Sequence, residues 1–413
     1  MIILKYIMKI LLINRYNFID GGADRVFFNT CTLLKKHGNE VFTFSSTNEK
    51  NFFSDYSNYF VESIDYRNIS FFKKLNQGRN YLYNKNASRK LNRLIIDLKP
   101  DVAHLHLFYG ILSPSILKTL KKNHIPIVIT IHDYRLLCPA NAMLDRYSNV
   151  CEKCKNGNYL NCTFRKCSGG NFFYSFIITI EAYIRKYYIN PIKYVDHFIF
   201  VSKFSQNKHI EYDNRYKLKS THLYNFIEET SSRNQTKGDY FLYFGRLSKE
   251  KGIKNLILAV KNTNIKLRII GDGPQRDELK LLLSEVDNVE YLGFKSGNEL
   301  NDQILNCSFV IVPSEWYENN PMTIVEAFSF GKPVIGSIIG GIPELIQEKT
   351  GFRFEAGNVA SLKNSIYKAN NLNENEYKAL SDNCLSFAKE NFSEDSYYKS
   401  LKKIYNSVIN VNK

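Results

Sequence analysis

The chain has 413 residues, of which 44% are hydrophobic and 23% charged, and its formal net charge is +16. This length exceeds what one ordinary core organises and predicts two domains with sizeable apolar cores. No stretch is long and apolar enough to span a bilayer, and the start lacks the basic leader and small-residue cleavage site of a signal peptide. The first predicted strand begins at Met8, so either Met1 or Met8 can be the true start.

The positive charge is concentrated in the first half of the chain. Residues 1–232 hold 33 Lys and Arg against 18 Asp and Glu, a net +15, whereas residues 233–413 hold 23 against 22, a net +1. A basic face can meet nucleic acid, an anionic membrane or solvent. We find no nucleic-acid-binding module, so the asymmetry favours a membrane surface, where each basic group near anionic lipid adds about 1 kcal/mol.

Apolar runs alternate with amphipathic segments in the first half, which predicts a doubly wound β-α-β domain. The expected order is strand 8–13, a glycine pair at residues 21–22, helix 24–36, strand 41–44, helix 88–98, strands 102–106 and 127–131, strand 195–201 and helix 206–212. Residues 48–86 are polar and weakly patterned. The aperiodic residues 229–238 are the predicted linker between domains 1–228 and 239–392.

The aromatic segment 171–189 is too short and too charged to cross a membrane. Two interpretations remain open, a buried helix and an interfacial helix at a membrane surface. Phe172, Phe173, Tyr187 and Tyr188 suit the second, because aromatic side chains favour the boundary between lipid and water.

Three histidines lie on predicted central strands. His104 and His106 alternate with apolar neighbours and so face one side of the sheet, where we expect His104 to be packed in the core. His106 and His132 lie nearer the carboxyl ends of their strands, where ligands collect in such folds. Asp133 is placed to orient the His132 imidazole.

Five cysteines cluster in residues 138–167. Cys151 and Cys154 have the spacing of a metal knuckle, and Cys138, Cys162 and Cys167 can complete a tetrahedral site. A structural zinc on Cys138, Cys151, Cys154 and Cys167 is one interpretation, and free thiols are the other. Without a secretory signal we do not expect disulfides.

The second half repeats the strand–helix alternation. Strands are expected at 240–244, 265–270, 289–294 and 309–312, with helices starting near residue 253 and at 275–283 and 322–330, and helical structure from 359 to the end. Gly271 and Gly273 follow a strand, but Arg276 occupies the place of the third glycine in a dinucleotide fingerprint, so NAD binding is not indicated.

The segment PSEWYENNPMTIVEAF, residues 313–328, follows a buried strand and opens a helix at Pro321. Free N–H groups and the positive end of the helix dipole make residues 319–322 a natural place for a diphosphate. The carboxylates of Glu318 and Glu326 cannot bind that phosphate, so we expect them to bind hydroxyls of a sugar and a ribose.

This segment resembles, almost letter for letter, the E-x7-E element of retaining nucleotide-sugar glycosyltransferases of family 4. The loop GRLSKEKG, residues 245–252, resembles the family's G-R-L-x-x-x-K-G, and residues 130–133 resemble its T-x-H-D. The resemblance implies the GT-B fold, with two Rossmann-like domains facing across a cleft. The first binds the acceptor and the second the donor, and residues 393–413 cross back to the first domain as a helix.

The resemblance also implies roles for single residues. His132, Arg246, Lys251 and Glu318 take part in catalysis, the two cations by neutralising the leaving diphosphate. The implied substrate-binding residues are Gly22, Asp133, Gly245, Gly271, Gly273, Phe294, Asn319, Asn320, Pro321, Met322 and Glu326.

The implied activity is retaining transfer of a sugar from a UDP- or GDP-linked donor to a glycan or lipid-linked acceptor in surface polysaccharide synthesis. It needs no catalytic cofactor and places the protein in the cytoplasm, peripherally at the inner membrane face. The alternatives are a non-catalytic nucleotide-sugar-binding protein and a GT-B sugar-phosphate synthase or phosphorylase. A phosphorylase would need a pyridoxal lysine context that we do not find, and a binding relic would be expected to have lost Glu318, Arg246 or Lys251.

Overall fold

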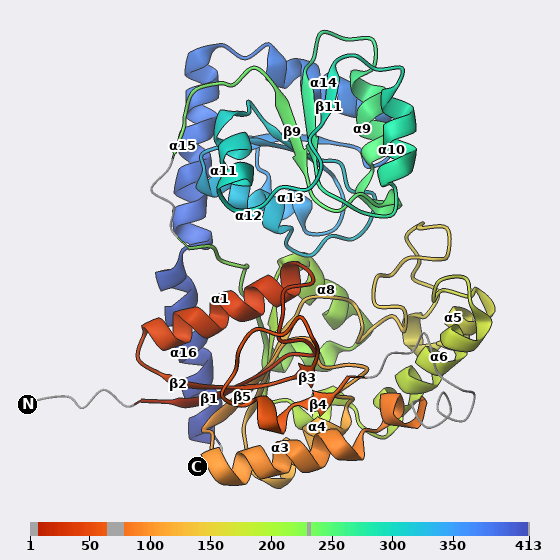
Figure 1. Ribbon diagram of the computed structural model, residues 1–413, viewed down its shortest axis with the longest axis vertical. Coiled ribbons are helices and arrows are strands. Elements are labelled where there is room, and N and C mark those ends of the chain that lie inside the picture. The colour runs from red at the N-terminus through yellow and green to blue at the C-terminus, as the bar shows by residue number, and fades with distance from the viewer. Residues whose placement is uncertain (1–6, 64–77, 229–232, 412–413) are drawn as a thin grey trace, which may run out of the picture.

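The computed structural model describes residues 7–63, 78–228 and 233–411, and it contains two six-stranded parallel sheets flanked by helices (Figure 1). The first sheet has the order β2-β1-β5-β6-β7-β8 and the second β11-β10-β9-β12-β13-β14. This is the expected α/β fold with two Rossmann-like domains. The strand order reverses direction between β1 and β5 in the first sheet and between β9 and β12 in the second, and ligands bind at such switch points.

The elements of the first half follow the expected alternation. Its strands are β1 (Lys9–Ile13), β2 (Glu40–Phe44), β3 (Ser46–Thr47), β4 (Val61–Glu62), β5 (Val102–Leu105), β6 (Ile127–Ile131), β7 (His197–Phe200) and β8 (Ser220–His222). Its helices are α1 (Gly22–Lys36), α3 (Lys85–Leu98), α4 (Ser115–Lys122), α5 (Leu160–Phe164), α6 (Phe172–Tyr187), α7 (Pro191–Tyr194) and α8 (Lys203–Tyr212). Sequence reasoning missed β8, a polar edge strand, because its three residues contain no apolar run.

The elements of the second half are equally regular. Its strands are β9 (Phe241–Phe244), β10 (Leu267–Ile270), β11 (Val289–Tyr291), β12 (Val310–Val312), β13 (Val334–Ser337) and β14 (Gly351–Phe354). Its helices are α9 (Ile253–Val260), α10 (Arg276–Leu283), α11 (Gly297–Asn306), α12 (Met322–Ser329), α13 (Ile342–Leu345), α14 (Val359–Asn370), α15 (Glu374–Asn391) and α16 (Glu394–Val411). Residues 229–232 of the expected linker and 64–77 of the weakly patterned segment lie outside the described residues.

The central strands are mostly apolar and almost completely buried because helices cover both faces of each sheet. All five residues of β6 are buried, as are four of the five in β1. This leaves polar chemistry to the loops at the carboxyl ends of the strands.

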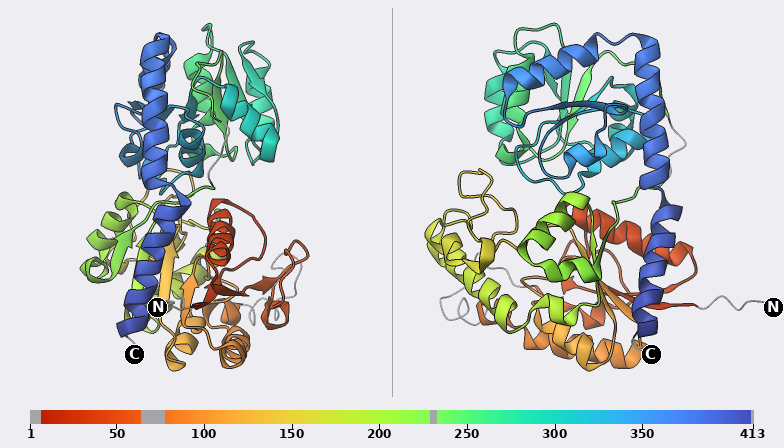
Figure 2. Two further views of the ribbon diagram at one scale, coloured as in Figure 1. Left: turned by 90° about the vertical axis from the view of Figure 1, so that its left-hand side faces the viewer. Right: turned by 180° about the vertical axis from the view of Figure 1, so that it is seen from behind.

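Helix α16 crosses back to the first domain, as the family resemblance implies. Helix α15 lies along the second domain and α16 continues beside the first (Figure 2). Tyr397, Leu401 and Tyr405 of α16 pack with Leu12 of β1 and Phe27 of α1 in one buried cluster. The last helix therefore joins the two domains through apolar packing.

Helix α16 also supplies a hydrogen-bond partner for His104, the histidine expected in the core. His104 is fully buried, with Nδ1 2.7 Å from the Tyr405 hydroxyl and Nε2 2.7 Å from Thr130 Oγ1. Both ring nitrogens are thus paired inside the core. Among the described residues, no helix is long and apolar enough to cross a membrane.

Candidate active site

Two loops meet at the switch point of the second sheet. Residues 245–252 leave β9, and residues 313–321 leave β12. Gly245, Lys251, Ser314, Glu318 and Pro321 help to line one small cavity of about 20 Å³ between them. The structure therefore brings together residues that the sequence places about 70 positions apart.

Glu318 is the buried centre of this junction, with 5% of its surface exposed. Its Oε1 lies 2.5 Å from Lys251 Nζ and accepts a hydrogen bond of 2.7 Å from the Ser314 hydroxyl. Burial by itself would raise the pKa of Glu318, but the nearby Lys251 charge and these hydrogen bonds hold it below its ordinary value. The carboxylate is therefore ionised and able to accept hydrogen bonds from hydroxyls. Sequence reasoning did not single out Ser314.

Close backbone approach explains why Gly271 and Gly340 are glycines. A methyl group on Gly271 would lie 1.8 Å from the carbonyl oxygen of Gly245, and one on Gly340 2.6 Å from the Glu318 amide nitrogen. Any other residue at either position would push the loops apart. Glycine here keeps the loops after β9, β10 and β13 packed around the site.

The start of α12 lacks a side-chain cap. Pro321 is its N-cap and makes no side-chain cap hydrogen bond, and the first N–H groups of any helix have no partner within the helix. Arg246 is exposed, and among the described residues no carboxylate lies within ion-pair distance of it. A helix N-terminus and a free guanidinium at one junction are suited to a diphosphate.

Glu326 lies on α12 and is bound from the other domain. Its Oε1 accepts a hydrogen bond from Nη1 of Arg25 on α1, and only 6% of the residue is exposed. Burial raises the pKa of Glu326 above its ordinary value, although Arg25 acts in the opposite direction. Sequence reasoning missed Arg25, since nothing local links residues 301 positions apart.

The side chains of Asn319 and Asn320 contact the first domain. Asn319 Nδ2 donates to the carbonyl oxygen of His132 over 2.7 Å, and Asn320 Oδ1 accepts from the Asn225 amide over 2.8 Å. Both residues were expected to bind substrate. In the structure each side chain makes a contact across the domain boundary, while Asn319 Oδ1 and Asn320 Nδ2 are buried without a hydrogen-bond partner among the described residues.

His132 directly follows β6 at this boundary. Its Nε2 lies 2.9 Å from Nδ1 of His106, and burial lowers the pKa of His132 to about 3, so the pair is neutral near pH 7. Asp133 was expected to orient the imidazole, but the contacting ring is that of His106. The Asp133 carboxylate instead accepts a hydrogen bond of 2.9 Å from the Arg135 amide.

Two further expected site residues lie at the edges of the junction. A methyl group on Gly22, at the start of α1, would lie 3.7 Å from Met322 Cγ, so the glycine loop faces the start of α12. The Phe294 side chain follows β11 and is exposed, with 72% of its surface accessible. An exposed ring beside the loop of Gly271 can stack on a nucleotide base.

Cys138 lies in a small buried cluster with Tyr134 and Leu137, apart from three of the other clustered cysteines. Cys154 and Cys162 share a buried cluster with Cys167, and the Cys162 and Cys167 thiols are hydrogen-bonded. Burial raises the pKa of Cys138 to about 11. Within residues 7–63, 78–228 and 233–411, no three His, Cys, Asp or Glu side chains are arranged to hold a metal ion, so zinc stays a prediction.

Two Rossmann-like domains of parallel strands, joined by a last helix that returns to the first, are the GT-B arrangement. Residues 20–230 match the family described as Glycosyltransferase Family 4, and residues 226–384 match the one described as Glycosyl transferases group 1. The chain belongs to glycosyltransferase family 4.

Similar proteins agree with this assignment. An uncharacterized glycosyltransferase of Methanocaldococcus jannaschii is 26% identical over 404 residues, which cover 97% of this chain and 98% of that protein. A lipopolysaccharide outer core galactosyltransferase has the same fold, with a TM-score of 0.65, 18% identity, and coverage of 97% and 99%. The Anabaena protein HepE, solved with UDP and glucose, has a TM-score of 0.64, 17% identity, and coverage of 97% and 100%.

Proposed function

We propose that this glycosyltransferase moves a sugar, with retention, from a UDP- or GDP-linked donor to a glycan or lipid-linked acceptor in surface polysaccharide synthesis. The observation that carries the proposal is that Lys251, Glu318 and Pro321 at the start of α12 line one cavity, while Arg246 is exposed on the same loop as Lys251. The cations and the helix end suit a diphosphate, and the carboxylates suit hydroxyls.

In the proposed step, the acceptor oxygen attacks the anomeric carbon from the face that the diphosphate leaves. The bond to the diphosphate oxygen breaks with its electron pair, and the departing phosphate takes the acceptor proton. Arg246, Lys251 and the N–H groups of α12 stabilise the growing negative charge, a task for which other enzymes use a metal ion. Glu318 orients the donor sugar and Glu326 the ribose.

The acceptor side supports a membrane location. Helix α6 buries Glu181 and Arg185 on its inner face, while Phe172, Phe173 and Tyr187 are each about half exposed or more. This inverts the usual pattern of a surface helix and favours the interfacial interpretation. Together with the basic first half, it supports a cytoplasmic protein docked peripherally on the inner membrane face.

The test is a screen of UDP- and GDP-sugars for release of the nucleotide by the purified protein. We expect one donor to be turned over, and Arg246→Ala to lower that turnover by about two orders of magnitude or more, as for loss of a transition-state charge contact. Arg353→Ala removes an exposed arginine from β14 and serves as the control. Full turnover in Arg246→Ala would contradict the proposed site.

A further inference from the structure

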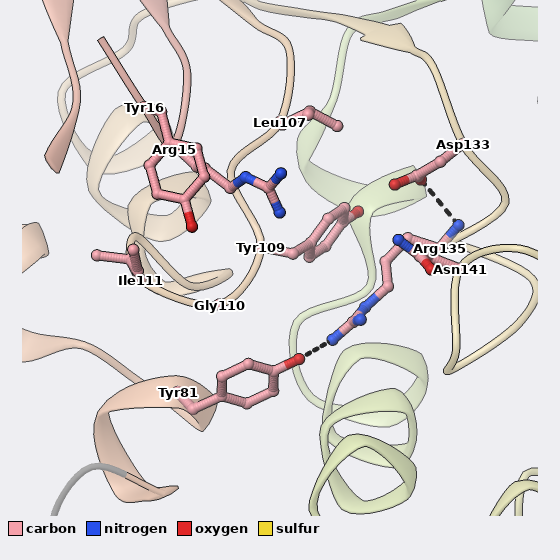
Figure 3. Close-up of a pocket in the computed structure, with 10 residues that line it drawn as sticks. All are labelled: Arg15, Tyr16, Tyr81, Leu107, Tyr109, Gly110, Ile111, Asp133, Arg135 and Asn141. Atoms are coloured by element: carbon pink, nitrogen blue, oxygen red, sulfur yellow. Dashed lines mark hydrogen bonds between the residues drawn. The ribbon is translucent and has the colours of Figure 1, made fainter. Parts of the chain in front are cut away.

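A second polar cavity lies in the first domain, with a volume of about 210 Å³. Its walls come from the loops that follow β1, β5 and β6, so it lies at the switch point of the first sheet. Arg15, Tyr109, Asp133 and Arg135 are among the residues that line it (Figure 3). The space has room for several water molecules and is therefore large enough for a substituent of a substrate.

Arg15 reaches into this cavity without a counter-ion. Its guanidinium points toward the space between Tyr109 and Asp133 (Figure 3), and it lies 4.5 Å from the ring centroid of Tyr16. Among the described residues no carboxylate is within ion-pair distance, and the buried Arg15 Nε has no hydrogen-bond partner. A buried donor on a cation is costly unless a ligand pairs it.

Arg135 is the second cation of the cavity, and 9% of it is exposed. Nη2 donates to the Tyr81 hydroxyl and lies 3.4 Å from Glu181 Oε2, which fixes the side chain. Its Nε and the Tyr109 hydroxyl are buried and unpaired within the described residues. The cavity thus contains several buried hydrogen-bond donors that have no acceptor. A planar guanidinium can donate two parallel hydrogen bonds to the oxygens of a phosphate or carboxylate.

Two carboxylates near the cavity would repel a bound anion. Asp133 faces the cavity, and one of its oxygens accepts from the Arg135 amide. Asp24 lies behind Asn14, whose Nδ2 donates to it over 2.8 Å. Both are already partly paired, and Asp133 keeps capacity to accept a hydrogen bond from a hydroxyl group.

The cavity adjoins the donor site. Asp133 directly follows His132, whose carbonyl oxygen is bound by Asn319 of the E-x7-E loop. A molecule with one end in the cavity can therefore extend toward the boundary where Glu318 and Lys251 meet.

We propose that this cavity binds an oxyanion group, phosphate or carboxylate, of the acceptor, with Arg15 and Arg135 as its partners and Asp133 receiving a hydroxyl of the same molecule. This specifies an acidic acceptor. It rests on the proposed function, because it assigns the acceptor side of that reaction.

The test is calorimetric titration of the full-length protein with inorganic pyrophosphate and, separately, with glucuronate. Every protein carries Arg246→Gln, which weakens the donor's diphosphate site. We expect Arg15→Gln to weaken binding of the preferred probe about tenfold or more, as for loss of a charge-assisted fork. Arg93→Gln, on the outer face of α3 with 81% of its side chain exposed, should bind as the parent does.

Each probe stands for one source of the oxyanion. Tighter binding of pyrophosphate supports a phosphorylated acceptor, and tighter binding of glucuronate supports an acidic sugar. No binding of either probe, or equal loss in Arg15→Gln and Arg93→Gln, overturns the proposal. The titration needs no donor, so its failure is distinguishable from failure of the nucleotide-release test.

Discussion

The carboxylate of Glu326 has two alternative partners. It binds Arg25 in the structure, and in the proposed donor complex it binds a ribose. A buried carboxylate that binds a diol contributes to nucleotide affinity, whereas in the proposed step Arg246 and Lys251 stabilise the charge that builds on the diphosphate. Binding of the donor must therefore share or displace the Arg25 contact.

We accordingly expect Glu326→Gln to weaken nucleotide affinity about tenfold, with a smaller effect on turnover at saturating donor. Nucleotide binding measured by calorimetry and donor turnover measured separately give the two quantities. Glu348→Gln changes an exposed glutamate of the same domain and should leave both unchanged. A fall in turnover with unchanged affinity would contradict a ribose role.

Buried neutral histidines make stability depend on pH. Burial lowers the pKa of His104 and His132 to about 3 and of His209 to about 4, from an unfolded value of about 6.5. Below that value the unfolded chain takes up protons that the folded chain does not. The free energy of unfolding should therefore decrease as the pH is lowered from about 6.5 to 4. Above pH 6.5 the contribution of these histidines to stability is complete.

The measurement is urea unfolding at pH 7.5, 6.5 and 5.5. Each histidine contributes a slope of up to about 1.4 kcal/mol per pH unit. His209→Gln should be less stable at pH 7.5, and its stability should depend less on pH than that of the parent, because the variant lacks this titrating group. The other titrating groups are the same in both proteins and cancel in the comparison. An unchanged slope would mean that His209 is protonated in the folded state.

At the scale of elements, cysteines form part of the buried clusters in the loops and short helices between β6 and α6. Backbone amides of Ala140 and Met143 donate to the Cys138 sulfur, and this lowers its pKa against the larger effect of burial. Amide donors around a thiolate also stabilise metal ligands. We propose a structural zinc here, which would draw the thiols closer than they lie in the structure.

We expect protein purified without chelator to hold close to one zinc per chain by elemental analysis. Cys154→Ser should lose the metal, whereas Cys31→Ser, on α1 and away from the cluster, should keep it. Zinc-free protein that still transfers sugar would leave these cysteines as packing residues.

At the scale of the whole molecule, the excess positive charge and the exposed aromatic side chains of α6 both lie in the first half of the chain. The first 232 residues carry net +15, and helix α6 exposes its aromatic face there. Electrostatic attraction to anionic lipid is screened within about 10 Å at 0.1 M salt, while apolar anchoring is not.

Sedimentation with anionic vesicles should therefore pellet the protein at low salt and release part of it as salt rises. The double substitution Phe172→Ser/Phe173→Ser should reduce binding at every salt concentration. Leu281→Ser removes an apolar side chain from α10 that is 76% exposed, and should have no effect. Equal loss in both variants, or no binding by the parent, would favour a soluble acceptor.

The sequence by itself determined the two α/β domains, because their strands and helices depend on local physics, whereas the return of the last helix to the first domain was implied by the family resemblance. Apolar runs such as β6 predict buried parallel strands, and Pro321 predicts the start of α12 to within one residue. The proposed catalytic residues Arg246, Lys251 and Glu318 lie in the short loops after β9 and β12, so their residue types can be read one motif at a time.

Tertiary structure decided which side chains meet. Arg25 with Glu326, Tyr405 with His104, and Arg15 with Arg135 each join segments that are more than one hundred residues apart. The orientation of α6 also depended on its neighbours, since Glu181 is buried only because Arg135 and Arg185 pair with it. Periodicity reports which face of a helix is apolar, whereas the partner that a buried charge finds is set by how distant elements pack.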